Sequence, residues 1–132
     1  MKKYQLRSGK LLEIDLVPTE LALELYRTVV NECARCKFDL KIEDGTTQLE
    51  LIGKNSEAIL RVLGSDEVME VVQRCCAKVI YNKQKFSMDL FDNIEAKGDF
   101  FGIMIIVALE NLLPFFPHLR SRFETLLSAF VM

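Results

Sequence analysis

The chain has 132 residues, of which 50% are hydrophobic and 27% are charged, with a formal net charge of -2. This length fits one domain around one core, and the composition is that of a globular protein rather than a disordered one. Neither half of the sequence holds the dense positive charge that nucleic-acid backbones require, so nucleic acid is not an expected partner.

The first 17 residues predict a β-hairpin. Apolar and polar residues alternate on both sides of Ser8-Gly9, which is a turn signal. The residues expected on its apolar face are Tyr4, Leu6, Leu12, Ile14 and Leu16. The N-terminus lacks the continuous apolar region of a signal peptide, so we expect the chain in the cytoplasm with its four cysteines reduced.

A helix is predicted from Glu20 to about Lys37, because Pro18 breaks the strand and Thr19 can cap a helix. The apolar stripe of this helix consists of Ala22, Leu25, Tyr26, Val29, Cys33 and Cys36.

The next segment is ambiguous. Residues 38–42 alternate as a strand does, and a turn signal after them allows a second hairpin. A capping box formed by Thr47 and Glu50 favours a helix instead, running to about Leu63. We adopt a short strand followed by this helix.

Gly64 then ends that helix and Ser65 caps another. The apolar stripe expected for it consists of Val68, Val71, Val72, Cys75 and Val79. The stretch "YNKQKF", residues 81–86, is interpreted as a polar connection in which Asn82 takes a positive φ.

Two further helical segments and a final helix complete the chain. Ser87 is expected to cap a short helix that carries Leu90, Phe91 and Ile94. Gly98 and Asp99 are expected to introduce a long apolar helix, which Pro114 should end or kink. The last amphipathic helix is built on Leu119, Phe123, Leu126, Leu127 and Phe130.

This order of elements predicts a mainly α fold. We expect a single domain over residues 1–132, with a small β-hairpin at 1–17 and a helical body at 19–132. The helical body is expected to be a compact bundle of about five helices.

The run from Phe100 to Leu109 is hydrophobic on every side. Its ten residues are fewer than the ~20 that cross a bilayer, and Glu110 and Asn111 interrupt it, so a membrane span is not expected. A helix with no polar face cannot be an ordinary surface helix. It is either a central core helix, or a helix covered partly by the body of the protein and partly by another chain.

The cysteines suggest one site for a metal ion. Cys33 and Cys36 have the CxxC spacing, and Cys75-Cys76 could add two more thiolates for zinc. The CxxC pair, however, falls within a helical stripe, and adjacent cysteines are a poor geometry for one tetrahedral site. Buried thiols that act as small hydrophobic groups are the preferred interpretation, and neither a metal nor a cofactor is expected.

No pattern of a catalytic site is found. His118 is the single histidine, and the sequence contains neither a nucleophile elbow nor a phosphate-binding glycine loop. The acidic series Asp89, Asp92, Glu95 and Asp99 is interpreted as a solvated helix face, because it lacks the loop spacing of a calcium site. We therefore do not expect an enzyme.

Four segments, in order along nearly the whole chain, resemble one group of bacteriophage tail assembly chaperones. "LRSGKLLEIDLVP" is similar to the SGK hairpin that opens those proteins, and "LRVLGSDEVMEVVQRCC" with "YNKQKFSMDLFD" resembles their middle helices and connector. "AKGDFFGIMIIVALENLLPFF" resembles their Asp-aromatic helix start, apolar helix and Asn-Leu-x-Pro-Phe ending. Residues 38–56 match nothing in that group.

The resemblance implies a non-enzymatic protein of the host bacterial cytoplasm that is made during tail assembly and is not retained in the mature virion. Such chaperones bind and solubilise the hydrophobic tape measure protein, help to recruit tail tube protein, and tend to form homo-oligomers. No map of contact residues transfers from them. Candidates for partner binding, chosen because aromatic and apolar residues anchor interfaces, are Phe100, Phe101, Ile105, Phe115, Phe116, Phe123 and Phe130.

Two other classes of protein remain open. A small helical prophage-encoded DNA-binding regulator would need a recognition helix with exposed basic or amide residues, whereas the richest basic cluster, "YNKQKF", is a connector. A zinc or redox protein would use the cysteines.

Overall fold

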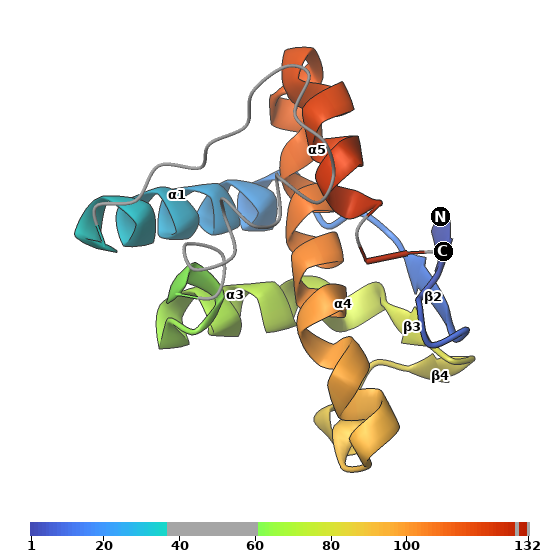
Figure 1. Cartoon of the computed structure of the whole chain (residues 1–132). Coiled ribbons are helices and arrows are strands. Elements are labelled where there is room, and N and C mark those ends of the chain that lie inside the picture. The colour runs from blue at the N-terminus through green and yellow to red at the C-terminus, as the bar shows by residue number, and fades with distance from the viewer. Residues whose placement is uncertain (37–60, 129, 132) are drawn as a thin grey trace.

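The structure is a computed structural model that describes residues 1–36, 61–128, 130 and 131. Most of these residues are helical, and four short strands form an antiparallel sheet in the order β1-β2-β3-β4 at one side of the molecule (Figure 1). The prediction of a mainly α fold with a small β element is confirmed. The predicted strand at 38–42 and all but the end of the helix that follows it lie outside the described residues.

The N-terminal hairpin is confirmed. β1 (Lys2–Gln5) pairs with β2 (Leu11–Ile14), and Gly9 has the φ of 90° that the connecting turn needs and that glycine adopts without strain. Leu16, predicted on the apolar face, is instead 50% exposed. It lies beyond the end of β2, where the alternation of the strand no longer sets the direction of the side chain.

A second hairpin was missed in the sequence. β3 (Ile80–Tyr81) pairs with β4 (Gln84–Lys85), and β3 also pairs with β2, so the two hairpins form one sheet. Asn82 has the predicted positive φ, 49°, and Lys83 follows at 66°, as a two-residue hairpin turn requires. Strands of two residues are too short to show alternation.

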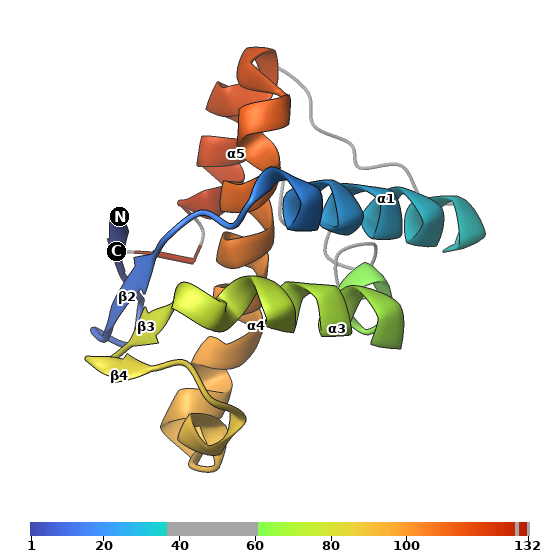
Figure 2. The same cartoon turned by 180° about the vertical axis from the view of Figure 1, so that it is seen from behind.

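Two predicted helices are confirmed and lie side by side. α1 (Thr19–Cys36) begins at Thr19 itself, and α3 (Asp66–Cys75) is capped by Ser65, whose hydroxyl accepts from the Val68 N–H at 3.3 Å. A 3-10 turn, η1 (Cys76–Lys78), follows α3, so the buried Val79 lies outside the helix to which it was assigned. Both helices cross the long helix α4 (Ile94–Leu112) on the same side (Figure 2).

α4 (Ile94–Leu112) starts earlier than predicted. Asn93 caps it, accepting from the Ala96 N–H at 2.8 Å, so Gly98 and Asp99 lie inside the helix. The Ser87 cap is confirmed, but the helix it starts is the short 3-10 turn η2 (Met88–Phe91), and Ile94 belongs to α4. Ser87 and Asn93 are both helix-capping residues and lie only six positions apart. The sequence therefore does not show clearly which of them starts the long helix. Pro114 ends α4 as expected.

The middle and end of α4 form the centre of the core. The segment from Ile103 to Asn111 is buried, and α1, α3 and the last helix, α5 (Arg120–Leu127), all pack against α4. With the residues after it, α4 spans Ile94–Phe115 at a mean hydropathy of 1.6, which by length and composition is enough to cross a bilayer. Length and composition alone therefore do not exclude a span, and the expectation of no membrane span stays a prediction. A core helix of a soluble protein has the same composition, and burial of Ile103 to Asn111 is the arrangement expected of one.

After α4 come two 3-10 turns, η3 (Leu113–Phe115) and η4 (Pro117–Leu119), and then α5 (Arg120–Leu127). α5 packs against α4, along its upper part in Figure 1, and buries Leu126 and Leu127 as predicted. Leu119 and Phe130, both assigned to this helix, lie outside it: Leu119 belongs to η4, and Phe130 lies beyond the end of α5.

The last residues of the chain return to the N-terminal hairpin. Leu6 forms an isolated antiparallel bridge with Val131, so the two ends of the chain lie close together (Figure 1). The ring of Phe130 covers Gly102 in α4, where a Cβ atom would stand 3.6 Å from Phe130 Cδ1.

Candidate functional site

An apolar groove of about 460 Å³ lies between η2 and the first turns of α4. We call it the α4 groove. It is lined by Met88, Asp89, Phe91, Asp92, Lys97, Phe100 and Phe101.

The α4 groove owes its position to two adjacent helix caps. Ser87 starts η2 by accepting from the Asp89 N–H at 3.3 Å, and Asn93 starts α4 by accepting from the Ala96 N–H. The chain therefore turns a corner between the two caps and lays η2 against α4. The N-terminal end of α4 extends past α3 in both views, so the large helices leave this end uncovered (Figures 1 and 2).

Two large apolar side chains of the groove are open to solvent. Phe101 is 46% exposed and Met88 is 49% exposed. Phe91 is buried and Phe100 is half-buried. Single exposed hydrophobic residues are ordinary on protein surfaces, but several that share one concave surface are typical of a binding site.

The groove rests on a row of aromatic rings. The ring centroids of Tyr81 and Phe91 are 5.1 Å apart, those of Phe91 and Phe100 are 5.2 Å apart, and those of Phe100 and Phe101 are 5.4 Å apart. These separations are those of favourable aromatic pairs. The exposed Phe101 ring is thus the last in a row of ring contacts that begins at Tyr81 in the sheet.

Behind the groove, Asp99 joins the sheet to α4. Its Oδ2 accepts from the Ser8 hydroxyl at 2.7 Å and from the Tyr81 hydroxyl at 2.6 Å. Burial, and then the hydrogen bond to Asp99, raise the pKa of Tyr81 above its ordinary value. We call these three residues the Asp99 cluster.

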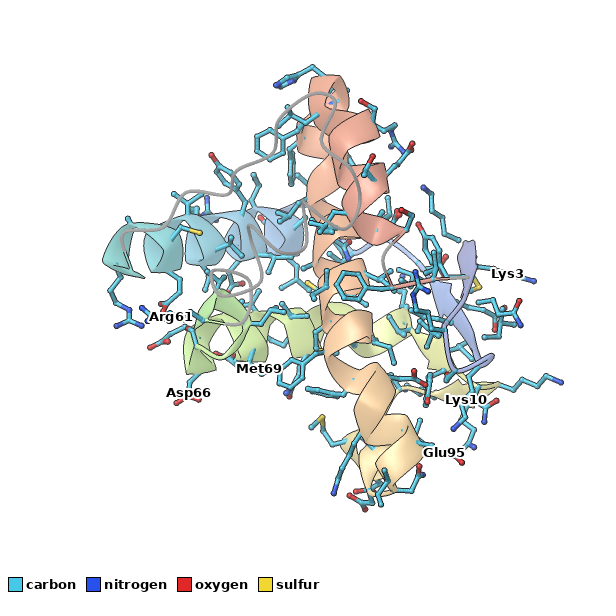
Figure 3. The ribbon with its side chains drawn as sticks, viewed as in Figure 1. Lys3, Lys10, Arg61, Asp66, Met69 and Glu95 are labelled. Carbon is cyan, nitrogen blue, oxygen red and sulfur yellow. The ribbon has the colours of Figure 1, made fainter. Side chains whose placement is uncertain are left out.

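An ion pair lies next to the Asp99 cluster. Lys10 Nζ is 3.8 Å from Glu95 Oε2 and 5.8 Å from the centroid of the Tyr81 ring. Figure 3 shows Lys10 from the hairpin and Glu95 from the start of α4 on the same side of the molecule. The pair connects the hairpin to the first turn of α4, but the Glu95 side chain is 84% exposed, so the contact adds little stability.

A different polar arrangement holds the other end of α4. Glu110, 3% exposed, accepts a hydrogen bond from the Tyr4 hydroxyl and pairs with Lys2 Nζ at 3.3 Å. Asn111 Oδ1 accepts from the Val17 N–H at 3.0 Å, and its Nδ2 donates to the Val107 carbonyl at 2.9 Å. In the sequence these two residues merely interrupt an apolar run, whereas in the structure they attach α4 to the N-terminal segment.

The candidate binding residues do not form one surface. Phe100 and Phe101 lie in the α4 groove. Ile105 is buried in the core and is not accessible in this structure, because it lies on the part of α4 that the other helices cover. Phe115 and Phe116 are half-buried at the far end of α4, where the Phe116 ring is 5.7 Å from that of Tyr26.

Of the remaining candidates, Phe130 is half-buried over Gly102, and the side chain of Phe123 lies outside the described residues. Sequence reasoning missed Met88 and Phe91 as members of a site. The signal that could have found them is the Ser87 cap, which sets Met88 and Phe91 three residues apart on a short turn.

The acidic series also divides in the structure, so it is not a single solvated helix face. Asp89 and Asp92 line the groove, Glu95 pairs with Lys10, and Asp99 belongs to the Asp99 cluster. The series spans η2 and α4, and the corner between them breaks the helical spacing on which that interpretation depended.

Two of the four cysteines are buried thiols, and Cys33 is half-buried. Cys75 and Cys76 are buried, and loss of hydration raises the pKa of Cys75 to about 11 and that of Cys76 to about 12. Both thiols are therefore protonated at neutral pH, and a protonated thiol is a poor nucleophile. Among the described residues no three His, Cys, Asp or Glu side chains come together to hold a metal ion. The side chain of Cys36 lies outside those residues.

Comparison with protein-family models, with curated proteins and with solved structures finds no match to this chain.

Proposed function

We propose that this protein is a tail assembly chaperone of a phage or prophage, which binds the hydrophobic tape measure protein, keeps it soluble and helps to recruit tail tube protein. The observation that carries the proposal is the α4 groove, where Met88 and Phe101 are open to solvent on a helix whose middle is otherwise sealed in the core. The resemblance in sequence supplies the identity of the client.

The positions of the resembling residues support the proposal. Ser8 comes from "LRSGK", Tyr81 from "YNKQKF" and Asp99 from "AKGDFF", and the three meet in one hydrogen-bonded cluster. Asn111, from "NLLPFF", holds the backbone of Val17 next to the first segment. Residues that a group of proteins shares because of a common fold are expected to make such contacts between distant segments.

The size of the groove suits a chaperone that must release its client. A cavity of about 460 Å³ accommodates one or two large side chains rather than a whole helix face. Each contact with the client would then be modest, and affinity would come from many copies of the chaperone along a long client. Displacement by tail tube protein needs contacts of this kind, because a single very tight interface would dissociate slowly.

The proposal also covers the catalysis, localisation, oligomeric state, partners and helix arrangement that were expected from the sequence. The protein acts without catalysis in the host bacterial cytoplasm, forms homo-oligomers and is absent from the mature virion. Nucleic acid and membrane are not its partners. The helical body is proposed to be a compact bundle of about five helices.

Co-expression with the tape measure protein of the same phage or prophage tests the proposal. We expect the tape measure protein to be soluble, and to copurify with this chain, only when the two are made together. A matched culture that makes the tape measure protein with an unrelated helical protein of similar size controls for general effects of co-expression. Equal solubility of the tape measure protein in both cultures, without copurification, would show that the proposal is wrong.

A further inference from the structure

We propose that the α4 groove selects a helical client segment that carries a large apolar side chain flanked by lysine or arginine. The helical character of this segment rests on the proposed function, since tape measure proteins are long and helical. The apolar anchor and the basic flank come from the groove itself.

Exposed large hydrophobic side chains are concentrated around the groove, and they indicate an apolar anchor on the client. Among the described residues, Met88, Ile94 and Phe101 are large hydrophobic side chains that are exposed within one short segment, residues 88–101. Met88 and Phe101 line the groove, and Ile94 does not. Methionine adapts to side chains of different shape, whereas Phe101 is held in place by its contact with Phe100. The groove therefore combines one fixed wall with one adaptable wall.

Two carboxylates in the groove indicate that the client carries basic residues next to its apolar anchor. Asp89 and Asp92 line it, and within the described residues neither of them forms an ion pair. Lys97 is the cation of the lining, whereas the neighbouring Glu95 is already paired with Lys10. The rim is thus net acidic, and a basic flank on the client would find two available partners.

The same charges argue against a second copy of this chain as the occupant. A symmetric dimer through the α4 groove would bring together two copies of a lining with two carboxylates and one lysine, and such an excess of like charge at an interface is unfavourable. A basic amphipathic segment satisfies both the apolar and the charged parts of the site, so it is the occupant that we infer.

Three designed helical peptides of 18 residues test this inference against the full chain. The first has a Leu/Phe face flanked by lysines, the second has the same face flanked by glutamates, and the third keeps the lysines but replaces the apolar face with Gln and Ser. Fluorescence anisotropy of labelled peptide measures binding. We expect the first to bind at least tenfold more tightly than either of the others. Equal binding of the lysine and glutamate peptides, or equal binding of the peptide without an apolar face, would overturn the inference.

Variants of the chain locate the site. Phe101→Ser and Met88→Gln should each weaken binding of the first peptide at least fivefold. The double variant Asp89→Asn/Asp92→Asn should bring the lysine and glutamate peptides to within about twofold of each other. Ile94→Ser is the matched control, since it removes a more exposed side chain that does not line the groove, and it should leave binding unchanged. Loss of binding in Ile94→Ser with retention in Phe101→Ser would place the site elsewhere. Because Met88→Gln and the double Asp variant change side chains at the surface, they test the site even if Phe101→Ser disturbs folding.

The peptide and co-expression experiments fail in different ways. If the wild-type chain solubilises the tape measure protein and Phe101→Ser does so equally well, the groove inference is wrong and the chaperone proposal stands. If the wild-type chain does not solubilise that protein but binds the lysine peptide through the groove, the site is correct and its client is another basic helical protein. A concentration-dependent dimer that Phe101→Ser abolishes, without selective binding of the lysine peptide, would instead identify the groove as an interface between copies.

Discussion

The two ends of α4 are both attached to the sheet through a buried or half-buried carboxylate, but the surroundings of the two carboxylates differ. Both ends carry large apolar side chains, and both are joined to the sheet by a carboxylate that accepts from a tyrosine, Glu110 from Tyr4 in β1 and Asp99 from Tyr81 in β3. Glu110 is buried and has Lys2 as an ion-pair partner, whereas Asp99 is half-buried and has the Ser8 hydroxyl as its second donor.

The large apolar side chains near the two carboxylates also differ in exposure: those near Glu110 are buried or half-buried, whereas Phe101 near Asp99 is exposed. At the Glu110 end α1 and α5 help to seal the helix into the core, while at the Asp99 end it extends past α3 and leaves Phe101 in an open groove (Figure 2). One helix can therefore supply both the centre of the core and a surface for a partner, if polar contacts fix each end separately.

The largest effect on stability is expected in the middle of α4. Ile106 is completely buried, so Ile106→Ala should lower the free energy of unfolding by about 2–5 kcal/mol through lost burial and the cavity that remains. Urea unfolding followed by circular dichroism measures the change, with Val30→Ala in α1, an exposed position, as the control. A loss below about 1 kcal/mol would show that α4 is not the centre of a closely packed core.

A matched pair of tyrosine variants compares the two ends directly. Tyr4→Phe removes a hydroxyl from a carboxylate that is shielded from water, and should cost about 1–3 kcal/mol of unfolding free energy. Tyr81→Phe should cost about 0.5–1.5 kcal/mol, because Asp99 keeps Ser8 as a donor and can be hydrated. Chemical denaturation of both variants measures the difference. The comparison between the ends fails if Tyr81→Phe is the more costly of the two.

Much of this arrangement could be predicted from the sequence. Caps and turns such as Ser65, Ser87 and Gly9 are local signals, since the side chain or the φ value that ends an element lies within that element. The alternation of the first strands and the apolar stripe of α1 also depend only on neighbours in the chain. These parts of the fold were predicted correctly, except that Leu16 lies beyond β2 and is exposed. The side chain of Cys36, the last member of the predicted stripe, lies outside the described residues.

What could not be predicted depends on contacts between distant segments. The second hairpin becomes part of the sheet because Tyr81 pairs with Leu12, far away in sequence. Glu110 looks like a defect in an apolar run until Tyr4 and Lys2 are placed beside it. Phe101 and Ile105 are four residues apart on the same apolar helix, and only the limits of α3 and η2 decide that one is exposed and the other buried. Composition identified candidate anchors but not which of them reach the surface.

Raising the pH into the alkaline range should lower the free energy of unfolding, because the buried thiols keep their protons in the folded state. Burial raises the pKa of Cys75 and Cys76 to about 11 and 12, so the folded state keeps both protons above pH 9 while the unfolded state releases them. The unfolded state then binds fewer protons, and stability should fall as pH rises, by up to about 1.4 kcal/mol per pH unit for each group within its window. The raised pKa values of Tyr4 and Tyr81 should add to the loss above about pH 10.

Urea midpoints at pH 8, 9.5 and 11 measure this dependence. The double variant Cys75→Ala/Cys76→Ala should show a shallower decline from pH 8 to 11 than the wild type, whatever its stability at pH 8. An identical decline in the two proteins would mean that the thiols are hydrated in the folded state.

The smallest effect on stability is expected at the open end of α4. Phe101 is 46% exposed, and serine has a similar helix propensity, so Phe101→Ser should change the unfolding free energy by less than about 1 kcal/mol. If the two ends of α4 have separate roles, the variant that loses more stability should be the one that retains more chaperone activity.

Below its melting temperature Ile106→Ala should still solubilise the tape measure protein in co-expression, because the α4 groove keeps its lining. The more stable Phe101→Ser should not. Soluble yield of the tape measure protein, divided by the yield of each folded variant, makes the comparison. A yield that simply follows stability across the two variants would mean that the exposed ring of Phe101 has no role of its own and that the groove is only an edge of the core.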